Sequence, residues 1–314
     1  MLKKCAFIFP GQGAQYVGMG KELSESFKTA RETYDMANEV LGFDIKRLIF
    51  TGPKEELIKT KNSQPAIFIT SIAALTVLNS KHKNIPLTHV AGLSLGEYSA
   101  LVAAGSIRFD DALKLVRARG VFMEQAAFEN QGKMLSIIGL DLDKIKDICE
   151  QTGAEIANLN CPGQVVVSLK EQIADKVKIL SQQAGAQRVV VLNVSGPFHS
   201  SLMKSSSTNL ANVLKNIEIT YPRIKFIANV TATPLNDPLE IKHALITQVT
   251  HTTYWEKSMR LMITAGVKRY YEIGPGKVLK GLMRMIDRNV EVINIEKPED
   301  ISNVMDVDSV KSLR

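Results

Sequence analysis

The segment Gly92-Leu93-Ser94-Leu95-Gly96 constrains the fold of this chain more than any other stretch. Its G-x-S-x-G spacing is typical of a serine on a sharp turn between a strand and a helix. Residues 88–91 are short and partly β-branched, whereas residues 95–104 have a helix-compatible composition that stops at Gly105. Because strand and helix pass close together at such a turn, glycine is needed on both sides of the serine. The pattern predicts a strand-turn-helix that exposes the Ser94 hydroxyl at the start of a helix.

The composition is that of an ordinary globular protein. Its 314 residues are 45% hydrophobic and 23% charged, which favours one large domain, or a large domain with a smaller one inserted. The net charge of +7 comes without a long Lys/Arg run, so we expect an acidic protein or an anionic ligand as partner, and no nucleic acid. The three cysteines lack C-x-x-C spacing, which predicts neither a disulfide framework nor a zinc site and indicates a reducing, cytoplasmic compartment. No segment approaches the length of a membrane span, so no membrane partner is expected.

The N-terminal segment offers a second candidate functional loop. Residues 5–9 form a continuous apolar run that ends at Pro10, which is typical of a buried parallel strand. The loop that follows, GQGAQ at residues 11–15, could present main-chain N–H groups to an anion or to a developing oxyanion. A plain tight turn is the simpler interpretation. A dinucleotide-binding loop is disfavoured because Tyr16 replaces the third glycine of G-x-G-x-x-G.

Helical and strand patterns then alternate. Residues 21–41 are amphipathic, and a second helix is expected to start at residues 62–65, with Pro65 in its first turn, and to continue through the very apolar residues 66–78. The chain then passes Pro86 into the strand before Ser94. This order of strand, helices, strand and helix predicts an α/β domain with a parallel sheet.

A charged side chain lies on the apolar face of the next predicted helix. Asp110 or Asp111 is expected to cap this helix, which runs to about Glu129. At about 100° per residue, its apolar stripe consists of Ala112, Leu115, Val116, Phe122, Met123 and Ala126. Arg119 falls inside that stripe, whereas Arg117 lies on the polar side. Because a guanidinium is costly to bury without an anion, Arg119 should pair either with a protein carboxylate or with a bound substrate.

The middle of the chain predicts a structural unit of its own. Strands are expected at residues 134–138, 155–159, 164–169 and 188–194, with helices at residues 142–151 and 171–184. The resulting β-α-β-β-α-β order is the ferredoxin-like arrangement. We therefore expect a small domain at residues 131–196, inserted between two segments of a catalytic domain at residues 1–130 and 197–297.

His199 is the one histidine that stands where a turn between the two expected domains meets a helix start. Ser200 and Ser201 are candidate caps of that helix. A helix N-terminus disfavours the imidazolium, so His199 should stay neutral and able to accept a proton. The alternative is a histidine that only makes structural hydrogen bonds between domains.

The C-terminal third contains a basic helix and a polar tail. Residues 270–273 are strand-like, and residues 277–288 predict a helix on which one face carries Lys277, Lys280, Arg284 and Arg288. That face could dock an acidic partner, and a merely solvated basic face is the simpler interpretation. Residues 298–314 are polar and lack a clear apolar period, so we expect a disordered tail.

Several collinear motifs make the chain resemble a known enzyme family. They are FPGQGAQ from residue 9, SQPA from 63, GLSLGEYSALVAAG from 92, RARG from 117, NLNCPGQVVVS from 158, SGPFHSSLM from 195 and YEIGPGKVL from 271. This set closely resembles the malonyl-CoA:acyl carrier protein transacylase family, the standalone acyltransferases of fatty acid and polyketide synthesis. The resemblance spans residues 7–295. It implies an α/β fold, with an α/β-hydrolase-like large domain that holds a parallel sheet and an inserted ferredoxin-like small domain.

The resemblance also implies the roles of the reactive residues. Ser94 would be the nucleophile and His199 its general base. The main-chain N–H groups of Gln12 and Leu95 would form the oxyanion hole, and Arg119 would hold the malonyl carboxylate.

Four further positions match the family less directly. The main-chain carbonyl of Gln248 would orient the imidazole, so no triad aspartate is expected. Gln64 and Asn160 match positions near the pocket, and Phe198 resembles malonyl-type members and should crowd an α-methyl branch. One departure is visible: Leu93 stands where the family usually has a histidine.

The implied reaction moves a malonyl group from malonyl-CoA to the phosphopantetheine thiol of an acidic acyl carrier protein. It would run through a malonyl-serine in a ping-pong cycle, in a monomer, without a metal or another cofactor. A trans-acting acyltransferase of a polyketide pathway stays open as an alternative. A serine hydrolase or thioesterase would share Ser94 and His199, but it would hydrolyse the acyl-enzyme without a carrier protein. A non-catalytic scaffold is disfavoured because Ser94, His199 and Arg119 are all present.

Overall fold

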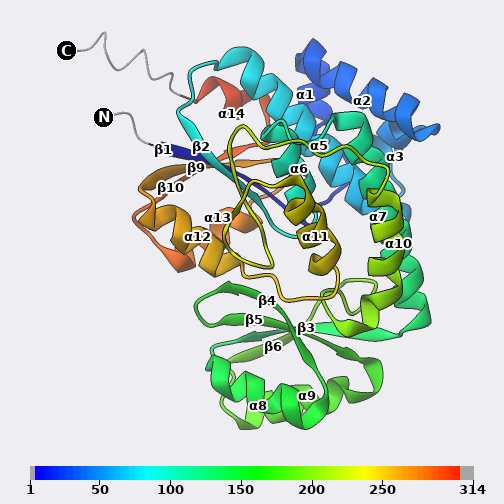
Figure 1. Ribbon diagram of the computed structural model, residues 1–314, viewed down its shortest axis with the longest axis vertical. Helices are drawn as coiled ribbons and strands as arrows, with labels where there is room; N and C mark the ends of the chain where they lie inside the picture. The colour runs from blue at the N-terminus through cyan, green and yellow to red at the C-terminus, as the bar shows by residue number, and fades with distance from the viewer. Residues whose placement is uncertain (1–3, 305–314) are drawn as a thin grey trace.

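The computed structural model describes residues 4–304 and contains two β-sheets, which lie in the upper and lower halves of Figure 1. The larger sheet has the strand order β10-β9-β1-β2-β7-β8. Its strands are β1 (Lys4–Phe9), β2 (Leu87–Gly92), β7 (Lys225–Ile227), β8 (Pro234–Leu235), β9 (Val267–Ile273) and β10 (Glu291–Ile295). All neighbours are parallel except β7 and β8. The predicted α/β fold with a mainly parallel sheet is therefore confirmed.

The central strand β1 consists almost entirely of apolar residues because both of its faces are covered. Phe7 and Phe9 point into one buried cluster, and Ala6 and Ile8 point into another. The second cluster contains α12 (Trp255–Thr264) and α13 (Val278–Ile286). The first contains side chains of α1 (Lys21–Ser26), α2 (Lys28–Leu41), α3 (Ile45–Thr51), α4 (Lys54–Leu57), α5 (Thr60–Lys81), α6 (Gly96–Ala103), α7 (Phe109–Glu129), α10 (Lys204–Leu214), α11 (Pro238–Gln248) and α14 (Pro298–Ser302).

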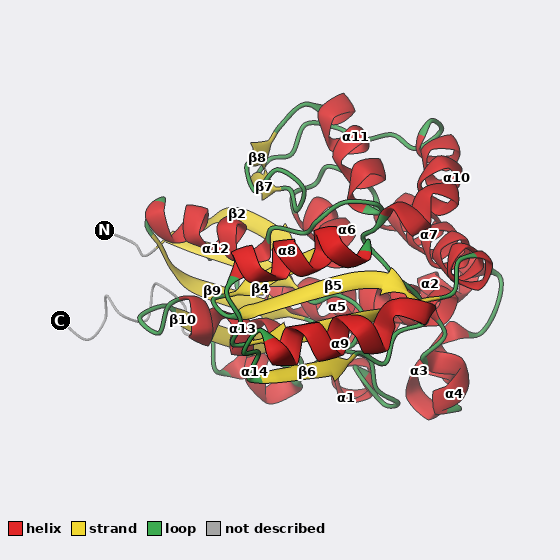
Figure 2. Ribbon diagram, turned by 90° about the horizontal axis from the view of Figure 1, so that it is seen from below, coloured by secondary structure: helices red, strands yellow, loops and turns green. Residues whose placement is uncertain are grey.

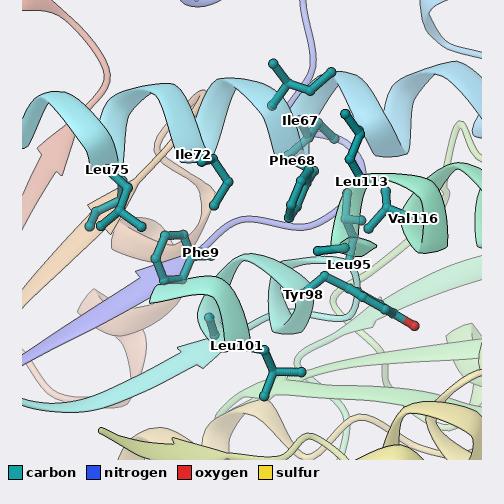
Figure 3. Packing of buried hydrophobic residues seen from close by; sticks show 14 of the residues in the cluster. Phe9, Ile67, Phe68, Ile72, Leu75, Leu95, Tyr98, Leu101, Leu113 and Val116 are labelled. Carbon is teal, nitrogen blue, oxygen red and sulfur yellow. The ribbon is translucent and has the colours of Figure 1, made fainter. Parts of the chain in front are cut away.

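Helix α5 runs through the first cluster and is buried on nearly all sides, as expected for a helix without a polar face. Figure 3 shows its side chains gathered with those of β1, α6 and α7. The rings of Phe68 on α5 and Phe109 on α7 stack with centroids 5.7 Å apart. This packing fixes α6, which begins just after Ser94, against α7, which carries Arg119.

The predicted start of α5 was wrong. The helix begins at Thr60, so Pro65 lies inside it instead of in its first turn. A proline has no N–H to give to the carbonyl four residues earlier, which is that of Lys61. Here the guanidinium of Arg117 donates to that carbonyl and also to Asn62 Oδ1, at 2.8 Å. Arg117 was predicted to lie on the polar, solvent-facing side of its helix. In the structure it packs against the start of α5 and replaces the missing donor.

The smaller sheet is antiparallel and has the order β4-β5-β3-β6. Its strands are β3 (Gly132–Ile138), β4 (Glu155–Cys161), β5 (Gln164–Lys170) and β6 (Arg188–Val191). Helices α8 (Leu142–Thr152) and α9 (Ala174–Gln183), the latter preceded by a short 3-10 helix at Glu171–Ile173, cover the face turned away from the larger sheet (Figures 1 and 2). The predicted order of elements is present.

The edge strand β4 joins the two halves of the molecule. Thr253 donates its main-chain N–H to the Ala157 carbonyl at 2.8 Å, and its carbonyl accepts from Leu159 N–H at 2.9 Å. Glu155, at the start of β4, accepts from the main-chain N–H and the hydroxyl of Ser201, in the short 3-10 helix Ser201–Met203. The smaller sheet is therefore hydrogen-bonded to the segments that follow His199 and Gln248 in the chain.

Two predicted helix caps were wrong. Helix α7 begins at Phe109 after Arg108, and Asp110 and Asp111 lie in its first turn, where negative charge is favourable, instead of at the cap. Ser200 precedes the 3-10 helix, but its hydroxyl donates to the Pro197 carbonyl and caps nothing. The longer helix α10 begins only at Lys204.

The first part of the predicted disordered tail, residues 298–304, is folded. Residues 298–304 are ordered: Pro298–Ser302 forms α14, with Ile301 and Val304 buried at 2% and 4% exposure. Asp300 accepts from the Lys297 N–H at 2.9 Å and closes the first turn. The expectation of a polar, disordered tail is therefore wrong for this part, because its few apolar residues are packed. Residues 305–314 lie outside the described residues.

Candidate active site

Ser94 lies on the predicted turn between β2 and α6, with a backbone φ of 51°. A residue with a side chain is strained in this left-handed region by about 1–2 kcal/mol. The two flanking glycines are required by contact. A Cβ at Gly92 would meet the Gly96 carbonyl carbon at 1.9 Å, and a Cβ at Gly96 would meet the Phe9 carbonyl oxygen at 2.2 Å. The strand-turn-helix prediction is confirmed, together with its steric reason.

Asn229, which follows β7, braces this turn. Its Oδ1 accepts from the Ser94 N–H at 2.7 Å, and its Nδ2 donates to the Gly92 carbonyl at 2.7 Å. The main chain on both sides of the turn is thus held by one buried side chain. Sequence reasoning missed Asn229. The available signal was its position just after a strand of the parallel sheet, at the edge where functional residues gather.

His199 meets Ser94 as the motifs led us to expect. Its Nε2 lies 2.9 Å from Ser94 Oγ, and its Nδ1 lies 2.7 Å from the Gln248 carbonyl oxygen. A carbonyl only accepts, so Nδ1 carries the proton and Nε2 is free to accept one from the hydroxyl. Burial, together with the positive charge of Arg119, lowers the pKa of His199 to about 4. The imidazole is therefore neutral, for reasons of burial and charge more than of helix position.

Arg119 is buried, with 1% exposure, and its guanidinium is held by neutral groups. Nη1 donates to Gln64 Oε1 at 2.8 Å, and Nη2 donates to Gln248 Oε1 at 2.9 Å and to Ser94 Oγ at 3.0 Å. Its Nε has no hydrogen-bond partner among residues 4–304. Of the two expected anions, a protein carboxylate in an ion pair with Arg119 is not found in this part of the chain. The guanidinium carbon also lies 5.6 Å from the centre of the Tyr98 ring, which is a further neutral partner.

The charge of Arg119 is influenced by the carboxyl group of Glu97, which sequence reasoning also missed. Glu97 lies in the first turn of α6 with 1% exposure. Burial raises its pKa to about 8, against the opposing influence of its hydrogen bonds and of Arg119. The signal in the sequence was that Glu97 is the one charged residue of its helix, Gly96–Ala103.

The two proposed oxyanion donors follow the ends of two neighbouring strands, β1 and β2. Gly11 and Leu93 are in close contact, and β1 and β2 end side by side with Phe9 paired to Gly92, so the loop that carries Gln12 abuts the turn that carries Leu95. Within the described residues, the N–H groups of Gln12 and Leu95 donate to no acceptor. Both are therefore available to a bound oxygen atom.

The remaining predicted positions are buried or partly buried. Asn160, on β4, is 9% exposed, and its Oδ1 has no partner within residues 4–304. Phe198 is 4% exposed and belongs to the main core cluster, next to His199. Leu93 packs against the second cluster and donates its N–H to the Phe9 carbonyl at 3.0 Å. An apolar side chain is thus well accommodated where the family usually has histidine.

No group of three or more His, Cys, Asp or Glu side chains among residues 4–304 is arranged to hold a metal ion. In the same part of the chain, no helix has the length and apolarity needed to cross a membrane.

A serine on a strained strand-helix turn, hydrogen-bonded to a neutral histidine, defines the class of enzymes that pass acyl groups through a serine ester. Residues 6–270 match the family described as acyl transferase domain. The chain is 42% identical to the malonyl CoA-acyl carrier protein transacylase of Bacillus subtilis (strain 168), over 96% of each protein. It therefore belongs to the malonyl CoA-acyl carrier protein transacylase family and is an acyltransferase.

Solved structures agree with this assignment. An acyl-carrier-protein-S-malonyltransferase from Bartonella henselae superimposes with a TM-score of 0.92 at 37% identity, covering 98% of this chain and 99% of that one. A malonyl-transacylase solved in complex with its type II polyketide acyl carrier protein gives a TM-score of 0.92 at 37% identity, covering 95% and 98%.

Proposed function

We propose that this chain transfers a malonyl group from malonyl-CoA to the phosphopantetheine thiol of an acyl carrier protein, through an ester on Ser94, and so supplies extender units for fatty acid synthesis. The observation that carries this proposal is the environment of Arg119. Its buried guanidinium lies 3.0 Å from Ser94 Oγ and has no ion-pair partner in the described chain. A buried cation beside a nucleophile suits an acyl group that itself carries an anion, as malonyl does and acetyl does not.

The chemistry follows from the contacts of Ser94 and His199. His199 Nε2 takes the hydroxyl proton while Ser94 Oγ attacks the thioester carbonyl carbon. The tetrahedral intermediate breaks its carbon–sulfur bond, and His199 returns the proton to the departing CoA thiolate. In the second half-reaction the carrier thiol gives its proton to His199 and attacks the ester, and Ser94 leaves as the hydroxyl. One site serves both halves, so the kinetics are ping-pong.

The N–H groups of Gln12 and Leu95 stabilise the negative oxygen of each intermediate. Both are unpaired in the described chain, so they need no rearrangement when charge develops. Losing one such donor typically costs about 3 kcal/mol of transition-state stabilisation.

Arg119 selects the acyl group by binding its carboxylate. The guanidinium gives up its contact with Ser94 Oγ and forms two parallel hydrogen bonds to the carboxylate. Gln64 and Gln248 keep the guanidinium plane in place. Asn160 contributes an unpartnered amide oxygen on β4, and the Phe198 ring beside His199 crowds an α-methyl branch.

The acceptor is an acidic carrier protein. The exposed basic face of α13 and its flanks, formed by Lys277, Lys280, Arg284 and Arg288, suits such a partner. This helix spans only Val278–Ile286, so Lys277 and Arg288 flank it. A carrier protein of a polyketide pathway is the second candidate acceptor, since one similar transacylase was solved with such a partner.

The proposal also covers the two domains, the oligomeric state and the cellular compartment of the enzyme. Residues 131–196 form a ferredoxin-like small domain, supported by the order β6-β3-β5-β4 of its antiparallel sheet. Residues 1–130 and 197–297 form an α/β-hydrolase-like catalytic domain. The enzyme works as a cytoplasmic monomer, without a metal or another cofactor.

Intact-mass spectrometry after exposure to malonyl-CoA tests the function. The wild-type chain should gain one malonyl group, and Ser94→Ala should gain none. Ser99→Ala, which removes another buried hydroxyl five residues along, is the matched control and should still acquire the adduct. Adding a holo carrier protein should remove the adduct faster than water does. An adduct on Ser94→Ala, or loss to water alone at the same rate, would contradict the proposal and favour a hydrolase.

A further inference from the structure

Glu97 occupies a central place in the hydrogen bonds beneath the site. It lies three residues after Ser94 in the first turn of α6 and is 1% exposed. Its Oε1 accepts from the main-chain N–H of Asn229 at 2.5 Å, and its Oε2 accepts from Gln248 Nε2. The mechanism proposed above gives Glu97 no role, although burying a carboxyl group is costly unless its oxygens are satisfied.

Both partners of Glu97 lead directly to the reacting groups. Asn229 accepts from the Ser94 N–H and so holds the main chain of the turn. Gln248 Nε2 also donates to the Ser94 carbonyl at 3.0 Å, and the Gln248 main-chain carbonyl accepts from His199 Nδ1 at 2.7 Å. Gln248 Oε1 accepts from Arg119 Nη2 at 2.9 Å. One carboxyl group therefore connects the nucleophile, the base and the buried cation.

The donors and acceptors in this network can be arranged in only one way. A guanidinium has no acceptor, so the atom of Gln248 that faces Arg119 must be the oxygen. Gln248 Nε2 then faces Glu97, and the Asn229 main-chain N–H faces it from the other side. Residue 97 must therefore offer a lone pair to each of these two donors, and both oxygens of a carboxyl group do so, whether or not the group is protonated. A glutamine of the same shape would place its own N–H₂ against one of these two donors.

We propose that Glu97 is a positioning residue of the acyl-transfer reaction, which holds Ser94, His199 and Arg119 in their mutual geometry through Asn229 and Gln248. This inference rests on the proposed malonyl transfer. Because Gln248 links to both His199 and Arg119, loosening it affects the rate of acylation and the preference for a carboxylate-bearing acyl group together. Displacements of about 1 Å at a reacting centre are enough to cost a hundredfold in rate.

The test is the variant Glu97→Gln, measured by rapid-quench acylation of Ser94 with malonyl-CoA and with acetyl-CoA. We expect the malonyl rate constant to fall roughly 10- to 100-fold, and the ratio of malonyl to acetyl rates to fall with it. The amount of folded enzyme is measured in parallel by circular dichroism. A purely structural role lowers the folded fraction but leaves this ratio unchanged, so an unchanged ratio in the folded variant overturns the proposal.

Glu272→Gln is the matched control. Glu272 is also a fully buried carboxyl group of the larger sheet. It accepts from the N–H groups of Leu279 and Lys280, each at 2.8 Å, and from Asn294 Nδ2 at 2.9 Å, which are different partners from those of Glu97. This variant should lose stability in a similar way and keep both the acylation rate of the folded enzyme and the malonyl-to-acetyl ratio. An equal loss of the ratio in Glu272→Gln overturns the assignment of a specific role to Glu97.

A second variant keeps the test decisive if Glu97→Gln does not fold. Gln248→Met removes the side-chain link between Glu97 and Arg119 but keeps the carbonyl that receives His199. It should reproduce the lower malonyl-to-acetyl ratio, and wild-type values would overturn the proposal. A wild-type chain that forms no malonyl adduct refutes the proposed function itself, which distinguishes that failure from a failure of the inference about Glu97.

Discussion

Lowering the pH should leave the acylation of Ser94 intact until well below the range in which a histidine ordinarily titrates. The reaction needs a neutral imidazole at His199, because Nε2 must accept the hydroxyl proton. Burial, and secondarily the charge of Arg119, lowers the pKa of His199 to about 4, compared with about 6.5 for an exposed histidine. The protonated, inactive form therefore accumulates only in the acidic range.

The expected magnitude follows from this difference in pKa. At about pH 5.5, an ordinary histidine is only about a tenth neutral, whereas a group with a pKa near 4 is almost completely neutral. The acylation rate constant should therefore stay within about twofold between pH 7.5 and 5.5, where an ordinary histidine would show roughly a tenfold loss.

The same shift affects stability, with a definite sign. The native state binds fewer protons than the unfolded state, so the free energy of unfolding falls as the pH drops from about 6.5 towards 4, by about 3 kcal/mol from this group. The folded fraction must therefore be monitored at each pH.

The assay is single-turnover acylation, followed by rapid quenching and intact-mass spectrometry from pH 7.5 down to 4.5. Arg119→Met, assayed with acetyl-CoA because it has no carboxylate to hold, should shift the acidic inflection upward, since it removes one of the two causes of the low pKa of His199. The wild-type chain is measured with acetyl-CoA for comparison. An inflection at pH 6–7 in the wild type, or an unchanged inflection in the variant, would refute the reasoning.

Three further changes have defined outcomes. Gly96→Ala places a Cβ 2.2 Å from the Phe9 carbonyl oxygen and should lower the free energy of unfolding in urea by about 1–3 kcal/mol or more, whereas Gly281→Ala, which meets nothing within 4 Å, should not destabilise. Arg119→Ala should slow malonyl acylation roughly a hundredfold or more and raise relative acetyl transfer; an unchanged ratio of the two would contradict the carboxylate contact. Reversing Lys280 and Arg284 to Glu should raise the KM for the carrier protein in steady-state transfer and leave acylation by malonyl-CoA unchanged; equal KM values would remove that docking face.

The turn at Ser94 could be predicted from the sequence because its requirements are local. Glycine is required at residues 92 and 96 because a Cβ there would clash with main-chain atoms a few residues away or in the adjacent strand β1. The burial of Arg119 was also predictable, because helical periodicity alone places it among apolar residues. In both cases the information lies within one or two neighbouring elements.

The predictions of helix bounds were wrong where a contact with a distant residue overrode the local sequence preference. Pro65 would normally mark the first turn of a helix, but Arg117 on α7 supplies the donor that the proline removes, so the helix extends back to Thr60. At the C-terminus, α14 forms in a polar segment because Ile301 and Val304 find buried positions against the core. Propensity and composition do not report such tertiary contacts.

The residues that hold Ser94 and His199 in place show most clearly that tertiary contacts cannot be predicted from local sequence. Ser94 and His199 both have φ in the left-handed region, at 51° and 58°, which their side chains disfavour. Such conformations persist only where surrounding contacts over-determine them. Here the contacts come from Asn229 and Gln248, each more than a hundred residues from Ser94 in the chain, with Glu97 between them. The motif therefore identifies the nucleophile, whereas the side chains that hold it in a strained geometry can be recognised only after the chain has folded.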